Sequence, residues 1–117
     1  MIMNNAQMLE SVVVLSQTEE KGMLGYAIAR NRQKLIPEIQ EYSKVRDELL
    51  RKHGTDIGDG KFQLPPENAA QFYAELRPFS ELTADVPVMQ VNLEVFCSGN
   101  LASSAMETLN WMVKDGD

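Results

Sequence analysis

The hydrophobic positions between Met23 and His53 repeat in a pattern typical of a long α-helix. Apolar side chains recur every seven residues, and others widen the stripe that they form: Leu24, Ile28, Leu35, Ile39, Tyr42, Val45 and Leu49. Because such spacing places side chains on one face of a helix, we expect this seam to pack against another element. Pro37 lies in the middle of the stretch. A proline removes one backbone hydrogen bond, so we expect a kink there or a short break between two helices.

Residues 5–20 carry a broad apolar stripe in which Leu9 and Val13 are four residues apart. The stripe predicts an amphipathic helix that folds back on the seam. The valines within residues 11–16 also allow a strand, since valine is a better strand former than helix former. We favour the helix because polar residues flank the run without alternating at every second position. Gly22 then predicts a helix C-cap of positive φ.

The residues after His53 predict shorter elements. Asp59-Gly60 is a turn dipeptide of the hairpin type, and residues 61–64 form a short strand that ends at Pro65-Pro66. Those prolines suit the first turn of a helix. The helix carries apolar side chains on one face, which we interpret as core: Ala69, Phe72, Tyr73, Leu76 and Phe79. Pro78 limits this helix to about three turns.

Residues 86–97, with the sequence VPVMQVNLEVFC, alternate between apolar and polar side chains. The alternation predicts a half-buried strand, which we expect to pair with residues 61–64. Cys97 is interpreted as a small core residue at the end of this strand. Residues 104–107, Ser-Ala-Met-Glu, fit a capping box that begins a last helix.

These patterns predict a mostly helical α+β protein that forms one domain over residues 1–117. Residues 5–54 form a helical hairpin whose long second helix is kinked near Pro37, and residues 55–117 form a strand-helix-strand-helix unit. This unit holds a small two-stranded antiparallel sheet and two further short helices. The predicted core and interaction seam consists of these side chains: Ile28, Leu35, Ile39, Tyr42, Leu49, Phe72 and Leu76.

Charge is distributed unevenly along the chain. The net charge is −6, and counting Lys and Arg against Asp and Glu gives −2 for residues 1–21, +3 for residues 22–53 and −7 for residues 54–117. The basic helix can pair with the acidic half of its own chain or of a neighbouring copy, or it can meet an acidic partner. Internal compensation is the interpretation that we favour, because charged helix faces are usually solvated. The net negative charge makes nucleic-acid binding an unfavourable hypothesis.

The sequence contains no motif for catalysis. It has no Gly-rich phosphate loop, no G-x-S-x-G nucleophile turn and no paired His and Cys residues at metal-binding spacing. His53, the sole histidine, is interpreted as a charge at a helix C-terminus. Residues 55–60 lack the ligand spacing of a calcium loop. We therefore expect no enzymatic activity, no cofactor and no metal.

The chain also lacks the signals of a membrane or secreted protein. Its longest apolar run, Val12 to Leu15, is far shorter than the roughly 20 residues that a membrane span requires. The N-terminus has no basic region followed by an apolar stretch, as a secretory signal would have. A single cysteine cannot form an internal disulfide, which suits a reducing compartment. We expect a cytoplasmic protein with no membrane contact.

Several short motifs resemble a known family. The run Tyr26-Ala27-Ile28-Ala29-Arg30-Asn31, the Lys52-His53-Gly54 that ends the long helix, and the segment Asp59-Gly60-Lys61-Phe62-Gln63-Leu64-Pro65 are similar to segments of small uncharacterised proteins encoded by phages and prophages. His53 stands where that family usually has an aromatic residue, and Pro37 interrupts the long helix. The resemblance implies a helical hairpin followed by a strand-helix-strand unit. It implies no activity and no site residue, because the family has none established.

Two functional hypotheses follow. The first is a structural or assembly protein of phage particle formation that self-associates through the long-helix hairpin and the strand edge. The second is a phage accessory protein that binds and inhibits a host protein, for example a defence or nucleic-acid-binding protein, through the acidic residues 54–117. The resemblance places either protein in the cytoplasm of a bacterial host, or in the virion. Neither hypothesis requires a small-molecule ligand.

Overall fold

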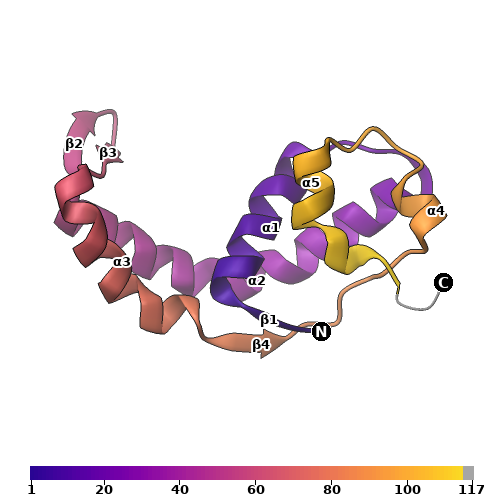
Figure 1. Ribbon diagram of the computed structural model, residues 1–117, viewed down its shortest axis with the longest axis horizontal. Coiled ribbons are helices and arrows are strands. Elements are labelled where there is room, and N and C mark those ends of the chain that lie inside the picture. The colour runs from indigo at the N-terminus through magenta and orange to yellow at the C-terminus, as the bar shows by residue number, and fades with distance from the viewer. Residues whose placement is uncertain (115–117) are drawn as a thin grey trace.

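The computed structural model describes residues 1–114 and shows a mostly helical α+β protein (Figure 1). The elements follow one another as β1 (Ile2–Asn4), α1 (Asn5–Gln17), α2 (Gly22–His53), β2 (Thr55–Gly58), β3 (Lys61–Gln63), α3 (Pro66–Ser80), β4 (Thr83–Asp85), α4 (Leu93–Phe96), α5 (Ser103–Thr108) and the 3-10 helix η1 (Asn110–Met112). The predicted hairpin of a short and a long helix is confirmed, since α1 folds back along α2.

Residues 11–16, for which the sequence allowed a helix or a strand, are helical and belong to α1. A capping box fixes its start: Asn4 Oδ1 accepts from the Gln7 backbone N–H at 2.8 Å, and Gln7 Oε1 accepts from the Asn4 backbone N–H at 2.9 Å. The predicted C-cap is wrong. Gly22 has a positive φ of 64°, but it is the first residue of α2, and α1 ends before the extended Thr18.

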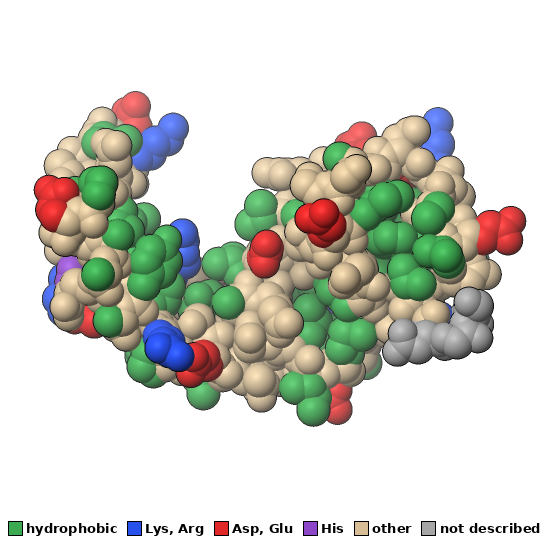
Figure 2. Space-filling model, viewed as in Figure 1, with side chains coloured by type: hydrophobic (Ala, Val, Ile, Leu, Met, Phe, Trp, Pro, Cys, Tyr) green, Lys and Arg blue, Asp and Glu red, His purple; other side chains and the backbone are tan. Residues whose placement is uncertain are grey.

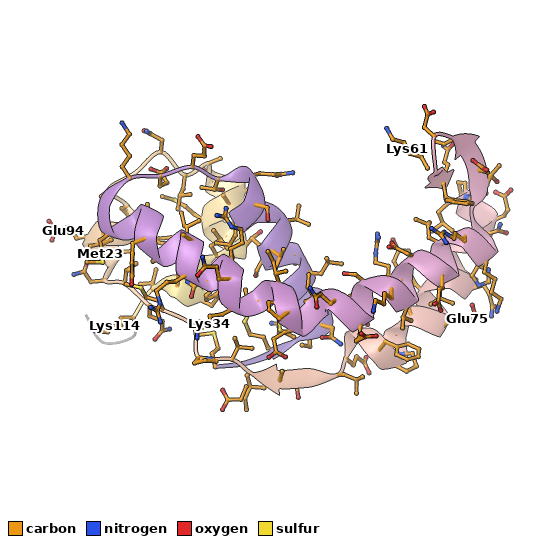
Figure 3. The ribbon with its side chains drawn as sticks, turned by 180° about the vertical axis from the view of Figure 1, so that it is seen from behind. Met23, Lys34, Lys61, Glu75, Glu94 and Lys114 are labelled. Atoms are coloured by element: carbon orange, nitrogen blue, oxygen red, sulfur yellow. The ribbon has the colours of Figure 1, made fainter. Side chains whose placement is uncertain are left out.

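The helix α2 is continuous through Pro37, so the alternative of a break between two helices is wrong. The helix is bent instead, and Figure 3 shows that it changes direction about midway along its length. A bend at a proline is expected, because the ring crowds the preceding turn and the missing N–H leaves a carbonyl without its helical partner. The bend divides the molecule into two parts.

We call these parts the body and the arm. The arm comprises residues 40–80, which hold the second half of α2, the β2–β3 hairpin and α3. The body comprises the other described residues. Each part has its own hydrophobic core: the arm buries only Tyr42, Phe72 and Leu76. The body buries a larger set: Met3, Met8, Leu15, Leu24, Ala27, Ile28, Leu35, Ile39, Val86, Val91, Phe96, Leu109 and Met112.

The predicted seam therefore has two partners. Its first part, with Ile28, Leu35 and Ile39, packs in the body core against α1. Tyr42 packs in the arm core with Phe72 and Leu76 of α3, and Leu49 is half-buried beside them. Leu9 of α1 touches both cores. All seven predicted seam residues thus lie in or against a core.

The sheets differ from the prediction. There are two small antiparallel sheets within residues 1–114: β2 pairs with β3, and β1 pairs with β4. The pairing of residues 61–64 with 86–97 is wrong. The Asp59-Gly60 turn is confirmed, since both residues have positive φ, 53° and 71°, as the central residues of a type I′ hairpin turn require.

Residues 86–97 do not form a continuous strand, because side chains bind several of the backbone groups that a sheet would use; an isolated parallel bridge joins Val91 to Val113. Asn31 binds both backbone polar groups of Met89. Asn92 accepts from the Val95 N–H and so caps the short helix α4. The apolar residues consequently face different ways: Val91 is buried and Leu93 is exposed. Local side-chain bonds of this kind compete with strand pairing.

Two smaller predictions near the C-terminus are also wrong. Cys97 follows α4 and is exposed, so it is not a core residue. The expected capping box at Ser104 is absent, because α5 begins one residue earlier, after Ala102, without a side-chain cap. The last helices are held to α1 by another contact, in which Trp111 Nε1 donates to the Ser11 hydroxyl at 3.0 Å.

Candidate protein-interaction surface

The arm projects from the body, so the molecule is curved and elongated (Figures 1 and 2). Its principal extents are 45 × 28 × 22 Å, and its radius of gyration is 16.2 Å. A compact chain of this length has a radius of gyration of about 13 Å. The difference means that the arm and the body bury little of each other's surface.

The exposed area is correspondingly large. The accessible surface is 7642 Å², against about 6,400 Å² for a typical monomer of this mass, so the excess is about 1,200 Å². One partner in a standard protein–protein interface contributes about 800 Å². The excess is a total for the whole molecule, and it exceeds that area.

An open groove lies where the arm leaves the body, between α1 and the middle of α2. It has a volume of about 490 Å³. Its lining is mostly aliphatic and neutral, with one charged residue: Val12, Ile36, Ile39, Gln40, Ser43 and Lys44. Ile36 is exposed to solvent here although it is a large aliphatic side chain.

A second hollow of about 410 Å³ lies further along the arm, between α2 and the β2–β3 hairpin. Its lining consists of Asp47, Leu50, Arg51, Ile57, Gly60, Lys61 and Phe62. Ile36 and Gln40 of the groove and Asp47 and Arg51 of the hollow follow one another at four- and seven-residue spacing, so they share one face of α2. We call the groove and the hollow together the inner face.

Two lysines line the inner face. Lys44 Nζ pairs with the Glu41 carboxylate of its own helix at 3.1 Å, and Lys61 projects from the hairpin at the far end of the arm (Figure 3). Within residues 1–114, no three His, Cys, Asp or Glu side chains come together in a group that could hold a metal ion. The inner face exposes Ile36 and Ile57 beside charged side chains of both signs, a mixture that is suited to contact with another protein.

His53, the sole histidine of the sequence, helps to hold the arm together. The Glu75 carboxylate of α3 accepts from Lys52 Nζ at 2.9 Å and also contacts His53 Nε2. The hydrogen bonds from Lys52 and from His53 lower the pKa of Glu75 from 4.5 to about 2. Asn68 Nδ2 donates to the His53 carbonyl at 2.7 Å, so α3 is fixed to the end of α2 at two points.

The predicted seam and the inner face share Ile39, which is buried, and otherwise consist of different residues. The seam residues are buried or half-buried within the two cores, so the structure leaves them little area for a partner. The exposed aliphatic residues Ile36 and Ile57 were not predicted. Ile36 is next to a seam position in the sequence, and Ile57 lies in the polar segment Thr55–Gly60. The available signal in the sequence was that both isoleucines stand outside the apolar repeats.

A search of protein-family models, of curated proteins and of solved structures finds no match to this chain. The family resemblance stated above therefore stays a prediction. None of the helices within residues 1–114 combines the length and the apolar composition that crossing a membrane requires.

Proposed function

We propose that this chain is a non-enzymatic assembly protein that binds a second copy of itself through the inner face. The observation that carries the proposal is the exposure of Ile36 and Ile57 on the inner face, together with the excess of about 1,200 Å² in the accessible surface of the whole molecule. A role in the assembly of a phage particle is part of the proposal. That part rests on the motif resemblance alone.

A second copy is favoured over an unlike partner because the inner face carries charges of both signs. Lys44, Arg51 and Lys61 are basic and Asp47 is acidic, and Lys44 is already paired with Glu41 of its own helix. In a twofold interface the same patch is used on both subunits, so Asp47 of one copy can meet a basic residue of the other. A surface with a strong net charge would repel its own copy.

The proposal is tested by measuring the oligomeric state. Sedimentation equilibrium of the wild type over a wide concentration range should show a reversible dimer. Ile36→Glu and Ile57→Glu each place a charge in the proposed interface, so each should raise the dimer dissociation constant by about tenfold or more. Both side chains are exposed, and the fold should be unchanged by circular dichroism.

Leu82→Glu is the matched control. Leu82 is 58% exposed, close to the 59% of Ile57, and it lines neither the groove nor the hollow. The control should dimerise as the wild type does. A protein that is monomeric at the highest concentration reached, or a dimer that both Ile36→Glu and Ile57→Glu leave intact, would overturn the proposal.

The accessory-protein hypothesis stays a prediction that has less support. It requires the acidic residues 54–117 to form a binding face. Three of these acidic groups are already in ion pairs: Glu75 with Lys52, Glu81 with Arg77, and Asp85 with the N-terminal amine. A partner captured from a host lysate in a salt-sensitive, stoichiometric complex would favour this hypothesis over self-association.

A further inference from the structure

The net positive charge of α2 comes from its first half. Residues 22–37 contain Arg30, Arg32 and Lys34 and no acidic residue, whereas residues 38–53 are balanced. The bend in the helix therefore coincides with a change in charge. The net charge of the whole chain is −6, so this positive segment stands out against a negative background.

These three cations make no ion pair within residues 1–114. The favoured interpretation of the sequence, that the basic helix is compensated by the acidic half of the chain, holds at the far end of α2, where Lys52 and His53 meet Glu75. It does not hold for the first half of the helix. A charge that its own chain leaves unpaired is available to a partner.

Four exposed side chains share one face of this half of α2. Met23, Tyr26, Arg30 and Lys34 follow one another at three- and four-residue spacing. Buried residues such as Ile28 lie on the opposite side. Met23 and Tyr26 are 56% and 55% exposed, respectively. Figure 3 shows Met23 and Lys34 on this half of the helix. We call these four residues the basic stripe; none of them lines the inner face.

Within the stripe, Arg30 is held in position by Tyr26. The guanidinium carbon lies 5.9 Å from the centre of the tyrosine ring, and Nη1 donates to the tyrosine hydroxyl at 3.3 Å. A cation that already rests on an aromatic ring loses less rotational freedom when it binds an anion. The stripe thus combines two exposed apolar side chains, a positioned guanidinium and a second cation one helical turn away.

We propose that the basic stripe docks an acidic, partly apolar helical segment of another protein. Carboxylates one turn apart on that segment meet Arg30 and Lys34, and an apolar side chain covers Met23 and Tyr26. Charge complementarity identifies the partner as acidic. Spacing by whole turns suits a helix laid along a helix. This inference is independent of the proposed self-association, because it uses a different face of α2.

A protein segment is favoured over nucleic acid by the surroundings of the stripe. Glu38 and Glu41 follow Lys34 on the same helix, and the whole chain is acidic. A phosphate polymer would be repelled by both. The stripe also offers only one aromatic ring for stacking against bases.

The probe is a synthetic, fluorescently labelled helical peptide with a central leucine and glutamates one and two turns to either side. This symmetric design fits the stripe in either direction along the helix. Fluorescence anisotropy with the full-length protein should show saturable binding that weakens as the salt concentration rises. A peptide of the same design with lysines in place of the glutamates should not bind.

Variants then locate the binding. Arg30→Glu with Lys34→Glu should weaken binding of the acidic peptide by about tenfold or more, because two attractive contacts become repulsive. Tyr26→Ala should weaken binding by about threefold, and Arg30→Lys by a similar factor, because neither keeps the positioned guanidinium. The matched control is Arg46→Glu with Arg77→Glu, which changes the net charge by the same amount at two positions of the arm that line neither the groove nor the hollow.

Any of the following three results would overturn the proposal. Equal binding of the glutamate and lysine peptides would show that charge complementarity does not operate. Equal loss in the stripe variant and in the arm control would show only a response to net charge. Tighter binding of single-stranded DNA or RNA of equal charge would assign the stripe to nucleic acid. The oligomeric state of the stripe variants, measured in parallel, keeps this result separate from the proposed self-association.

Discussion

Asn31 is fully buried on α2, and both of its side-chain polar atoms bind the backbone of Met89. Nδ2 donates to the Met89 carbonyl at 2.9 Å, and Oδ1 accepts from the Met89 N–H at 2.6 Å. The pair attaches the extended segment between β4 and α4 to the long helix. Because no other element offers strand pairing to Met89, we expect this side chain to be a main determinant of stability.

Asn31→Leu removes both bonds and keeps a side chain of similar size. Each backbone group left without a partner in a buried site costs about 1–3 kcal/mol. Met89 itself is only half-buried, so water can reach part of its backbone. We therefore expect a total loss of about 2–4 kcal/mol in the free energy of unfolding, and a melting temperature lowered by roughly 10 °C. Urea denaturation followed by circular dichroism measures this loss.

Gln33→Leu is the control, because Gln33 is exposed on the same helix and its replacement should change the free energy of unfolding by no more than about 0.5 kcal/mol. If Asn31→Leu proves as stable as Gln33→Leu, then the reasoning about the paired backbone groups is wrong.

Asn31→Asp examines the same bonds through their pH dependence. Burial raises the pKa of a carboxyl group at this position above the value of about 3.9 that it has in the unfolded chain. The protonated acid can donate to the Met89 carbonyl as asparagine does, so we expect near wild-type stability below about pH 4. Stability should then be lost as the pH rises through the raised folded-state pKa. A difference from wild type that does not vary with pH would contradict this account.

Three further predictions concern the arm and the turn between α1 and α2. The pKa of Glu75 is lowered to about 2, so its contribution to stability is complete above pH 4.5 and is lost as the pH falls toward about 2; urea denaturation of Glu75→Gln should show a weaker dependence on pH over this range. Gly25→Ala should destabilise by about 1–3 kcal/mol in thermal unfolding, although alanine normally stabilises a helix, because the new Cβ would overlap the Glu20 carbonyl group. Phe72→Ala should abolish amide-exchange protection in the arm while the body stays protected, whereas Leu15→Ala should weaken protection throughout; equal patterns in the two variants would show that the cores are not separate.

Elements with strong local signals could be predicted from the sequence. The apolar repeat every seven residues predicts one long helix, and α2 is continuous although it contains Pro37. A long seam buries enough apolar surface to offset the one hydrogen bond that the proline removes. The Asp59-Gly60 turn needs positive φ at both central residues, and few other dipeptides adopt that conformation readily. The start of α3 at Pro66 follows equally from the fixed φ of proline.

Features that depend on distant partners could not be predicted. The alternation of residues 86–97 predicts a strand, but Asn31 of α2 binds the backbone of Met89 and Asn92 caps the helix α4 within the same segment. The pairing of β1 with β4 joins residues about 80 positions apart in the sequence. The position of two isoleucines outside the apolar repeats did not identify the inner face, because the exposure of Ile36 depends on where α1 ends its contact with the bent helix.

The helix α2 contributes to both cores, and the smaller core of the arm bears on its proposed function. The body buries many side chains around α1 and α2, whereas the arm buries three and is held at its end by the contacts of Glu75 and Asn68. A unit with so small a core opens more readily than its surroundings. A partner that binds only the closed arm would stabilise it in proportion to its own concentration. The low burial in the arm is thus the expected property of a part that completes its packing when the inner face is covered.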